Sequence, residues 1–290
     1  MNKRLTAAPA KGWRERLLPI LFWLLVWEGA ALCAGHRSLE AAWTTWRQTG
    51  DISGLLTCLW EGQAFILPAP PRVAQELVEL VGTVDFWRTA AASLCRVFAG
   101  AAAGVGLGTV LAALTAVSWW ARLIFAPAVK VVRAAPVASF IILVLLWADR
   151  NWVPAIIAAL MVLPVVWGNV VQGVESTDAQ LLELARAYGF PRRRTLTLVY
   201  VPSVLPYFAA ACRTSLGLAW KAGVAAEVLC LPKLAIGTQV SNAKTYLETP
   251  ALFAWTLTVL FLSFVLERVL GRLLGRLERG KGGNDRAGDP

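Results

Sequence analysis

The chain has 290 residues, of which 57% are hydrophobic and 16% are charged, and its mean hydropathy is +0.58. This composition excludes an ordinary soluble domain, in which apolar and polar residues are more evenly mixed. The net charge of +10 is typical of a membrane protein with basic cytoplasmic segments, so we expect no nucleic-acid partner.

Residues that carry chemistry are sparse. The five cysteines show no C-x-x-C spacing, and His36 is the single histidine of the sequence, so we predict no metal site. The sequence also lacks the G-x-x-x-x-G-K-[ST] pattern that cradles nucleotide phosphates. We therefore predict no cofactor, no ATP site in this chain and no enzymatic activity.

Apolar runs of about 20 residues, the length that crosses a hydrocarbon core of about 30 Å, recur along the chain. The first run follows a basic segment at residues 1–16, and we interpret it as a retained helix because it is long for a signal peptide. The predicted spans are Leu17–Ala34, about Phe86–Val117, a third from the Ser118–Arg122 turn to about Trp147, about Trp152–Val174, about Thr195–Gly223 and about Pro250–Leu270. The fold class is therefore an all-α membrane protein with six transmembrane helices.

Two stretches have a distinctive pattern. Residues 36–85 mix charges with Trp43, Trp46 and Trp60, which is typical of an amphipathic segment at a membrane interface. The second predicted span carries Gly100, Gly104 and Gly108, four residues apart on one helix face. Small residues at this spacing favour close helix packing in lipid, and a sliding surface during gating is the functional alternative.

Basic residues concentrate in the segments that the six-span scheme assigns to the cytoplasm. This distribution predicts that both termini face the cytoplasm. We divide the chain into a cytoplasmic tail (residues 1–16), a transmembrane domain (17–275) with a polar loop at 175–194, and a Gly-rich tail (276–290) expected to be disordered.

The polar loop carries the most specific motif. It contains E-L-A-R-A-Y-G over residues 183–189 and V-Y-V-P over 199–202. This resembles the cytoplasmic loop of ABC-importer permeases, E-A-A-x3-G-x9-I-x-L-P, in which Glu183, Ala185 and Gly189 match and Leu184 replaces the first alanine. The resemblance covers roughly residues 65–275 and is greatest to permeases of the nitrate, sulfonate and taurine type. Part of residues 36–64 resembles an insertion relative to these permeases.

The resemblance implies a type I ABC-importer architecture in the bacterial inner membrane, with the loop as a coupling helix that docks on a separate ATPase subunit. Ala185 would allow close approach, Glu183 would accept hydrogen bonds or pair with a base, and Gly189 would adopt a positive φ and end the helix. Arg192 and its two neighbours would contact the ATPase or bind anionic lipid headgroups. The further partners implied are a second permease copy, an extracytoplasmic substrate-binding protein and the bilayer.

Three charged residues are candidates for the translocation path. Charges inside predicted spans are functional candidates because an unpaired charge is costly in lipid. Lys221 could attract an anionic substrate or could extend to the interface, and Glu227, six residues later, is not on the same helix face. Arg133 lies in R-A-A-P-V, similar to an R-A-x-P element of the family, either at a cytoplasmic gate or deeper.

The sequence therefore predicts the permease subunit of an ATP-driven ABC importer for a small solute such as nitrate, a sulfonate, taurine or a vitamin precursor. The alternative is an ion-coupled secondary transporter, which would need buried carboxylates and two similar halves. An intramembrane enzyme would need clustered His, Cys, Asp or Glu, which the sequence lacks.

Overall fold

The structure is a computed structural model that describes residues 13–50, 52–63 and 67–282. Most of the predicted N-terminal tail and the last residues of the predicted C-terminal tail lie outside these ranges. The chain divides into two compact units, which are described separately. The first comprises Met1–Thr83 with Ala243–Trp255, and the second comprises Val84–Asn242 with Thr256–Pro290.

The first unit begins with an apolar helix whose side chains are largely exposed, as expected of a helix surrounded by lipid. The residues after it, predicted to be an interfacial segment, form three short helices in this unit, and Gly50, whose φ is 72°, closes the first of them. The rings of Trp43 and Trp46 are in contact at a tilt of 46°, with centroids 4.8 Å apart. The elements are α1 (Trp13–Ala34), α2 (His36–Thr49), α3 (Ser53–Glu61), β1 (Gly62–Gln63), β2 (Leu67–Pro68) and α4 (Pro70–Val81).

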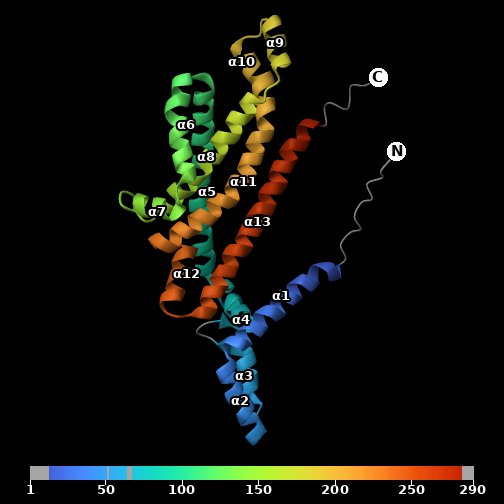
Figure 1. Ribbon diagram of the computed structural model, residues 1–290, viewed down its shortest axis with the longest axis vertical. Coiled ribbons are helices and arrows are strands. Elements are labelled where there is room, and N and C mark those ends of the chain that lie inside the picture. Colours follow the sequence, from blue (N-terminus) through green and yellow to red (C-terminus); the bar gives the residue numbers. More distant parts are fainter. Residues whose placement is uncertain (1–12, 51, 64–66, 283–290) are drawn as a thin grey trace, which may run out of the picture. The chain divides into compact units, whose positions relative to one another are not determined.

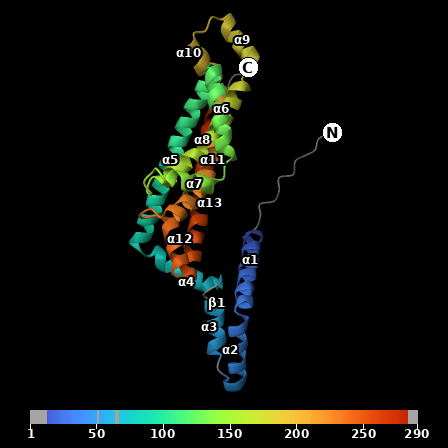
Figure 2. The same ribbon diagram turned by 60° about the vertical axis from the view of Figure 1, so that its left-hand side comes forward.

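The second unit is a bundle of long helices (Figure 1). Its elements are α5 (Val84–Val117), α6 (Trp119–Ala134), α7 (Val137–Leu145), α8 (Val153–Glu175), α9 (Ala179–Ala187), α10 (Arg192–Thr195), the π-helical turn η1 (Leu196–Tyr200) and α11 (Val201–Cys230). Two further helices, α12 (Ile236–Thr245) and α13 (Thr249–Gly282), contribute residues to both units. Figures 1 and 2 show α9 and α10 at one end of this bundle and the α11–α12 connection toward the other.

The centre of the bundle is the packing of α5 against α8, and the predicted glycine face is its contact surface. A Cβ on Gly100 would collide with the carbonyl of Ala155, and one on Gly104 would lie 2.6 Å from the carbonyl oxygen of Ala159. Gly108 is equally close to Leu163, at 2.9 Å. The prediction of close helix packing is confirmed, because the backbones of α5 and α8 are so close that a Cβ atom at these positions would not fit.

The third predicted span is not one straight helix. It is broken into α6 and α7, which meet at an angle of 106°. The break falls at Ala135 and Pro136, because proline lacks an N–H and forces the residue before it out of the helical region. Within the described residues, the structure thus has five helices able to cross a membrane, or six if the bent pair counts as one span.

Two helix ends differ from the predicted boundaries. The fifth span extends to Cys230 and not to Gly223, since the residues after Gly223 remain helical and half of them are buried. The last helix, α13, continues through residues 276–282, which the sequence assigned to the disordered tail. Trp220 ties α11 to α13 by donating its indole N–H to the carbonyl of Val259 at 3.2 Å.

Candidate functional site

The polar loop forms a compact helix, α9, with both ends closed by local hydrogen bonds. Asp178 precedes the helix and accepts a 2.8 Å hydrogen bond from the backbone N–H of Gln180, which caps a free amide. At the other end Gly189 adopts a φ of 62°, as predicted. Its N–H donates to the carbonyl of Arg186, and the N–H of Phe190 donates to that of Ala185. This pair of bonds is a Schellman motif, which fixes the end of the helix.

The chain turns directly after α9 into a second short helix. Pro191 precedes α10, and the N–H of Arg194 returns to the Pro191 carbonyl at 2.8 Å. The guanidinium of Arg194 lies 4.9 Å from the ring centroid of Phe190, a cation–π contact that closes the turn. Arg192, the predicted contact residue, is exposed at the start of α10. These contacts close the turn and leave Arg192 and Arg193 exposed on it.

The side chains of α9 differ in exposure. Ala185 is buried within its own chain, and its role as a point of close approach to an ATPase stays a prediction. Glu183 is exposed. Sequence reasoning missed an exposed apolar stripe formed by Leu181, Leu184 and Tyr188, which the i, i+3, i+7 spacing could have revealed. Tyr188 is 73% exposed, which is unusual for so large a side chain outside a lipid or protein contact.

An ion pair links the base of this loop to the neighbouring helix. Arg122, in the first turn of α6, donates to the carboxylate of Glu175 at 2.7 Å, and Glu175 is the last residue of α8. Both side chains are about half exposed, so the pair contributes little stability by itself. It nevertheless joins α6 and α8 at the end of the bundle that carries α9.

An apolar cleft with a volume of about 470 Å³ lies beside the loop. Thr109 and Tyr200 supply the polar atoms of an otherwise hydrocarbon lining. It is therefore unsuited to hold an ion. Its residues come from α5, α8, η1 and α11: Thr109, Ala113, Ala116, Val117, Val170, Val174, Leu196, Tyr200, Val201, Val204, Leu205 and Phe208.

The second polar centre surrounds Glu227, whose side chain is fully buried. Its carboxylate accepts hydrogen bonds from the guanidinium of Arg96 at 2.7 Å and from the hydroxyl of Ser93 at 2.9 Å. Gly237 adds its backbone N–H at 3.2 Å. Both carboxylate oxygens thus have donors, so this buried charge is paired and hydrogen-bonded.

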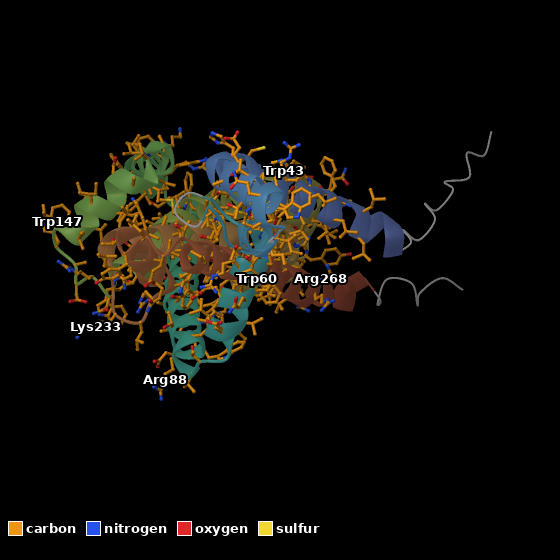
Figure 3. All side chains as sticks on the ribbon, turned by 90° about the horizontal axis from the view of Figure 1, so that it is seen from below. Trp43, Trp60, Arg88, Trp147, Lys233 and Arg268 are labelled. Carbon is orange, nitrogen blue, oxygen red and sulfur yellow. The ribbon has the colours of Figure 1, made fainter. Side chains whose placement is uncertain are left out.

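The same centre fixes the connection between α11 and α12. The first-turn N–H of Ile236 donates to Ser93, and Arg96 also donates to the carbonyl of Lys233. The N–H of Lys233 reaches the side chain of Asn151 in the α7–α8 turn at 3.1 Å. Figure 3 labels Lys233 at the edge of the bundle. Glu227 therefore holds a loop in place, and a Cβ on Gly237 would collide with it.

The predicted path residues are not brought together. Glu227 contacts Arg96 and Ser93 and lies on the buried face of α11, whereas Lys221 is exposed on the same helix. Arg133 is exposed in the last turn of α6, immediately before the break. Arg96 was missed from the sequence, although an arginine within an apolar span is itself an indication of a buried partner.

Comparison with known proteins agrees with this geometry. The family model of the binding-protein-dependent transport system inner membrane component matches residues 104–279, from α5 into α13. The taurine transport system permease protein TauC of Escherichia coli (strain K12) is 27% identical over 257 residues, which cover 83% of this chain and 93% of that protein. The putative aliphatic sulfonates transport permease protein SsuC of Bacillus subtilis (strain 168) is 28% identical, covering 66% of this chain and 69% of that protein.

A solved structure shares the fold. It is described as a crystal structure of an amino acid ABC transporter with histidines, with a TM-score of 0.54 at 17% identity, and the match covers 72% of this chain and 94% of that one. The family match spans more than half of the chain and decides against the ion-coupled secondary transporter. The chain belongs to the binding-protein-dependent transport system inner membrane components, the permeases of ABC importers.

Proposed function

We propose that this permease imports a small organic sulfonate, driven by a separate ATPase that docks on α9. The observation that carries the coupling role is the rigid helix α9, closed at both ends and bearing exposed Leu181, Leu184 and Tyr188. A rigid element transmits motion, whereas a flexible loop would absorb it. An exposed apolar stripe on such an element favours a protein partner.

The docking surface would use three kinds of side chain. The apolar stripe would enter a groove on the ATPase, where burial of Leu184 and Tyr188 supplies affinity. Glu183, at the outward side of α9, would pair with a base or accept backbone hydrogen bonds. Arg192 would contact the ATPase or the lipid headgroups beside it. Closure of two ATPase subunits on ATP would then move α9 and, through it, the bundle.

The substrate class rests on relatives. TauC and SsuC are named for taurine and aliphatic sulfonates, and these solutes carry a permanent negative charge on the sulfonate group. The exposed cations Arg133 and Lys221 are consistent with an anionic substrate. Another relative, from Chloroflexus aurantiacus, is named as a riboflavin transport permease. A vitamin is therefore the second candidate substrate.

The assembly would contain two copies of this chain around one path, with a substrate-binding protein on the outer side. Both termini and residues 175–194 would face the cytoplasm, in agreement with the arginines of the loop. The chain does no covalent chemistry. Its role is to bind, admit and release the solute as the ATPase changes state.

The coupling role is tested by purification of the tagged permease together with the ABC ATPase of its own transporter. Leu184→Asp should lose the ATPase, because a charge would be buried in an apolar contact. Gln180→Asp adds the same charge in the first turn of α9, where the helix dipole favours it, and should retain the ATPase. Equal recovery of the ATPase with both variants would contradict docking on this face.

A further inference from the structure

The helix α6 carries a row of positive charges that the proposed coupling role does not use. At about 100° per residue, Arg122, Lys130 and Arg133 fall within roughly 80° of one another around the helix axis. All three side chains are exposed. We name these three residues the cationic stripe, and it ends at the α6–α7 break.

Trp119 and Leu123, both exposed, lie beside the stripe in the first half of α6. The second half of the stripe, Lys130 and Arg133, does not share the face that suits lipid. Trp120, Ile124 and Val131 fall within roughly 40° of one another on the opposite side of α6. These apolar side chains are each more than 60% exposed. A helix with one apolar and one cationic exposed face is expected to turn the first to lipid and the second to protein or water.

The length of α6 separates the end of the stripe from the tryptophans at its start. Trp119 and Trp120 pack edge to face at the start of α6, where paired tryptophans are typical of the membrane interface. A rise of 1.5 Å per residue puts Arg133 roughly 21 Å along the axis from Trp119, within a hydrocarbon core of about 30 Å. The length of α6 thus places Arg133 inside the hydrocarbon core and away from the α9 end of the bundle.

The deep part of the stripe lacks an acidic partner among the described residues. Arg122 pairs with Glu175, but no ion pair involves Lys130 or Arg133 in the described ranges. The helices packed on α6 are α5 and α8, and Glu175 is the single acid in the part of them that faces α6, from Gly100 to Val117 and from Val153 to Glu175. Two like charges at i, i+3 repel, so an anion between them would stabilise both.

The break adds a favourable field at the same place. α7 begins at Val137, directly after Pro136, and the free N–H groups of its first turn carry partial positive charge. Discontinuous membrane helices expose such groups where they line a path and not where they face lipid. Arg133 lies in the last turn of α6, two residues before Ala135, where the break begins.

We propose that Lys130 and Arg133 form an anion-contact site inside the translocation path, which takes the sulfonate group of the substrate as it passes the α6–α7 break. This inference rests on the proposed function and names the residues that select the charge. The guanidinium of Arg133 offers two parallel N–H donors, which match two oxygens of a sulfonate, and Lys130 adds a single compact charge. Arg122 marks the far end of the stripe, where Glu175 neutralises it.

The test uses the complete transporter, with its ATPase and binding protein, in proteoliposomes that take up radiolabelled ethanesulfonate. Arg133→Gln should lower the uptake rate per assembled complex about tenfold, and Arg133→Lys should recover part of it, because the charge remains and the two-donor geometry does not. Lys130→Gln should lower the rate by a smaller factor. The matched control is Arg88→Gln, which removes an exposed arginine near the start of α5 (Figure 3). The ion pair of Arg88 with Asp85 is open to solvent, so this variant should leave the uptake rate unchanged.

The outcomes separate this inference from the function on which it rests. No uptake by the wild-type complex would overturn the sulfonate substrate and the inference with it. Normal uptake by the wild type and equal uptake by Arg133→Gln would overturn the inference alone. If the cations instead bind an anionic lipid, the defect of Arg133→Gln should vanish in vesicles of pure phosphatidylcholine. A defect of the same factor with and without phosphatidylglycerol supports the substrate site.

Discussion

Arg96 and Glu227 lie 131 positions apart in the sequence, and their side chains meet at 2.7 Å, one of them fully buried. The pair joins the first half of α5 to the last turns of α11 and, through Lys233 and Gly237, to the start of α12. Leu231 and Leu234 in that connection have φ values of 53° and 48°, which side chains normally disfavour. The surrounding hydrogen bonds hold this strained loop in one conformation.

Replacement of one member of this ion pair should lower the stability of the folded bundle. Arg96→Met leaves a buried carboxylate without its main partner and should destabilise the bundle by about 3–5 kcal/mol. The double variant with Glu227→Met should be more stable than Arg96→Met alone, because it removes the stranded charge. Thermal unfolding of the purified protein in detergent measures both.

The matched control for this pair is Arg122→Met, which breaks an ion pair of the same length that is about half exposed. It should cost at most about 1 kcal/mol. An Arg96→Met variant as stable as Arg122→Met would contradict the structural role of Glu227.

Substitutions at Gly189 test whether the turn that ends α9 is needed for coupling. A Cβ there meets no atom within 4 Å, so a substitution affects the backbone conformation and no neighbour. Gly189→Leu should cost about 1–2 kcal/mol locally, because leucine disfavours the positive φ, whereas Gly189→Asn should be tolerated. ATP hydrolysis stimulated by the binding protein should fall with leucine and persist with asparagine. The same activity in both variants would show that the Schellman turn is dispensable.

Two glycines of α5 test its contact with α8, because Gly100 lies in the contact and Gly106 does not. Gly100→Ala would drive a methyl group into the carbonyl of Ala155 and should destabilise the bundle by about 1–3 kcal/mol. Gly106 lies on the same helix with no atom near its would-be Cβ, so Gly106→Ala should be neutral or stabilising by about 0.5–1 kcal/mol. Unfolding temperatures of the two variants should therefore move in opposite directions, and equal shifts would contradict the close packing.

Topology is tested by cysteine labelling in a cysteine-free background. A cysteine at Gln180, on exposed α9, should resist a membrane-impermeant thiol reagent in intact cells and react after lysis. A cysteine at Lys244 should react in intact cells. Labelling at residue 180 from outside would contradict the predicted orientation, which rests on the arginine distribution.

The parts of the fold that sequence predicts are those set by short-range patterns. Apolar length predicts the spans, the four-residue glycine spacing predicts the α5–α8 contact, and Gly189 predicts the end of α9. The pairing of Arg96 with Glu227 was not predicted, because partners 131 positions apart leave no periodic pattern. The 106° bend was not predicted either, although Pro136 marked the break. Proline interrupts a helix, but the direction of the next helix depends on tertiary packing.

The exposure of side chains on α9 likewise depends on the folded structure and could not be read from the motif. The motif predicted Ala185 as a point of close approach, and the structure buries Ala185 against its own chain, whereas Leu184, which departs from the motif, is exposed. The exposure of each side chain of α9 depends on how the chain folds around it and not on the motif alone. The role of Glu183, Ala185, Gly189 and Arg192 in coupling stays a prediction.

The central claim is that ATP hydrolysis on a partner subunit drives a sulfonate through this chain. Proteoliposomes that hold the complete transporter should accumulate ethanesulfonate when ATP reaches the ATPase subunits, and ionophores that collapse proton and sodium gradients should not prevent it. Proteoliposomes prepared with Leu184→Asp and the same ATPase and binding protein should not accumulate the solute. Accumulation driven by an ion gradient without ATP, with the same rate in the wild type and in Leu184→Asp, would contradict the account.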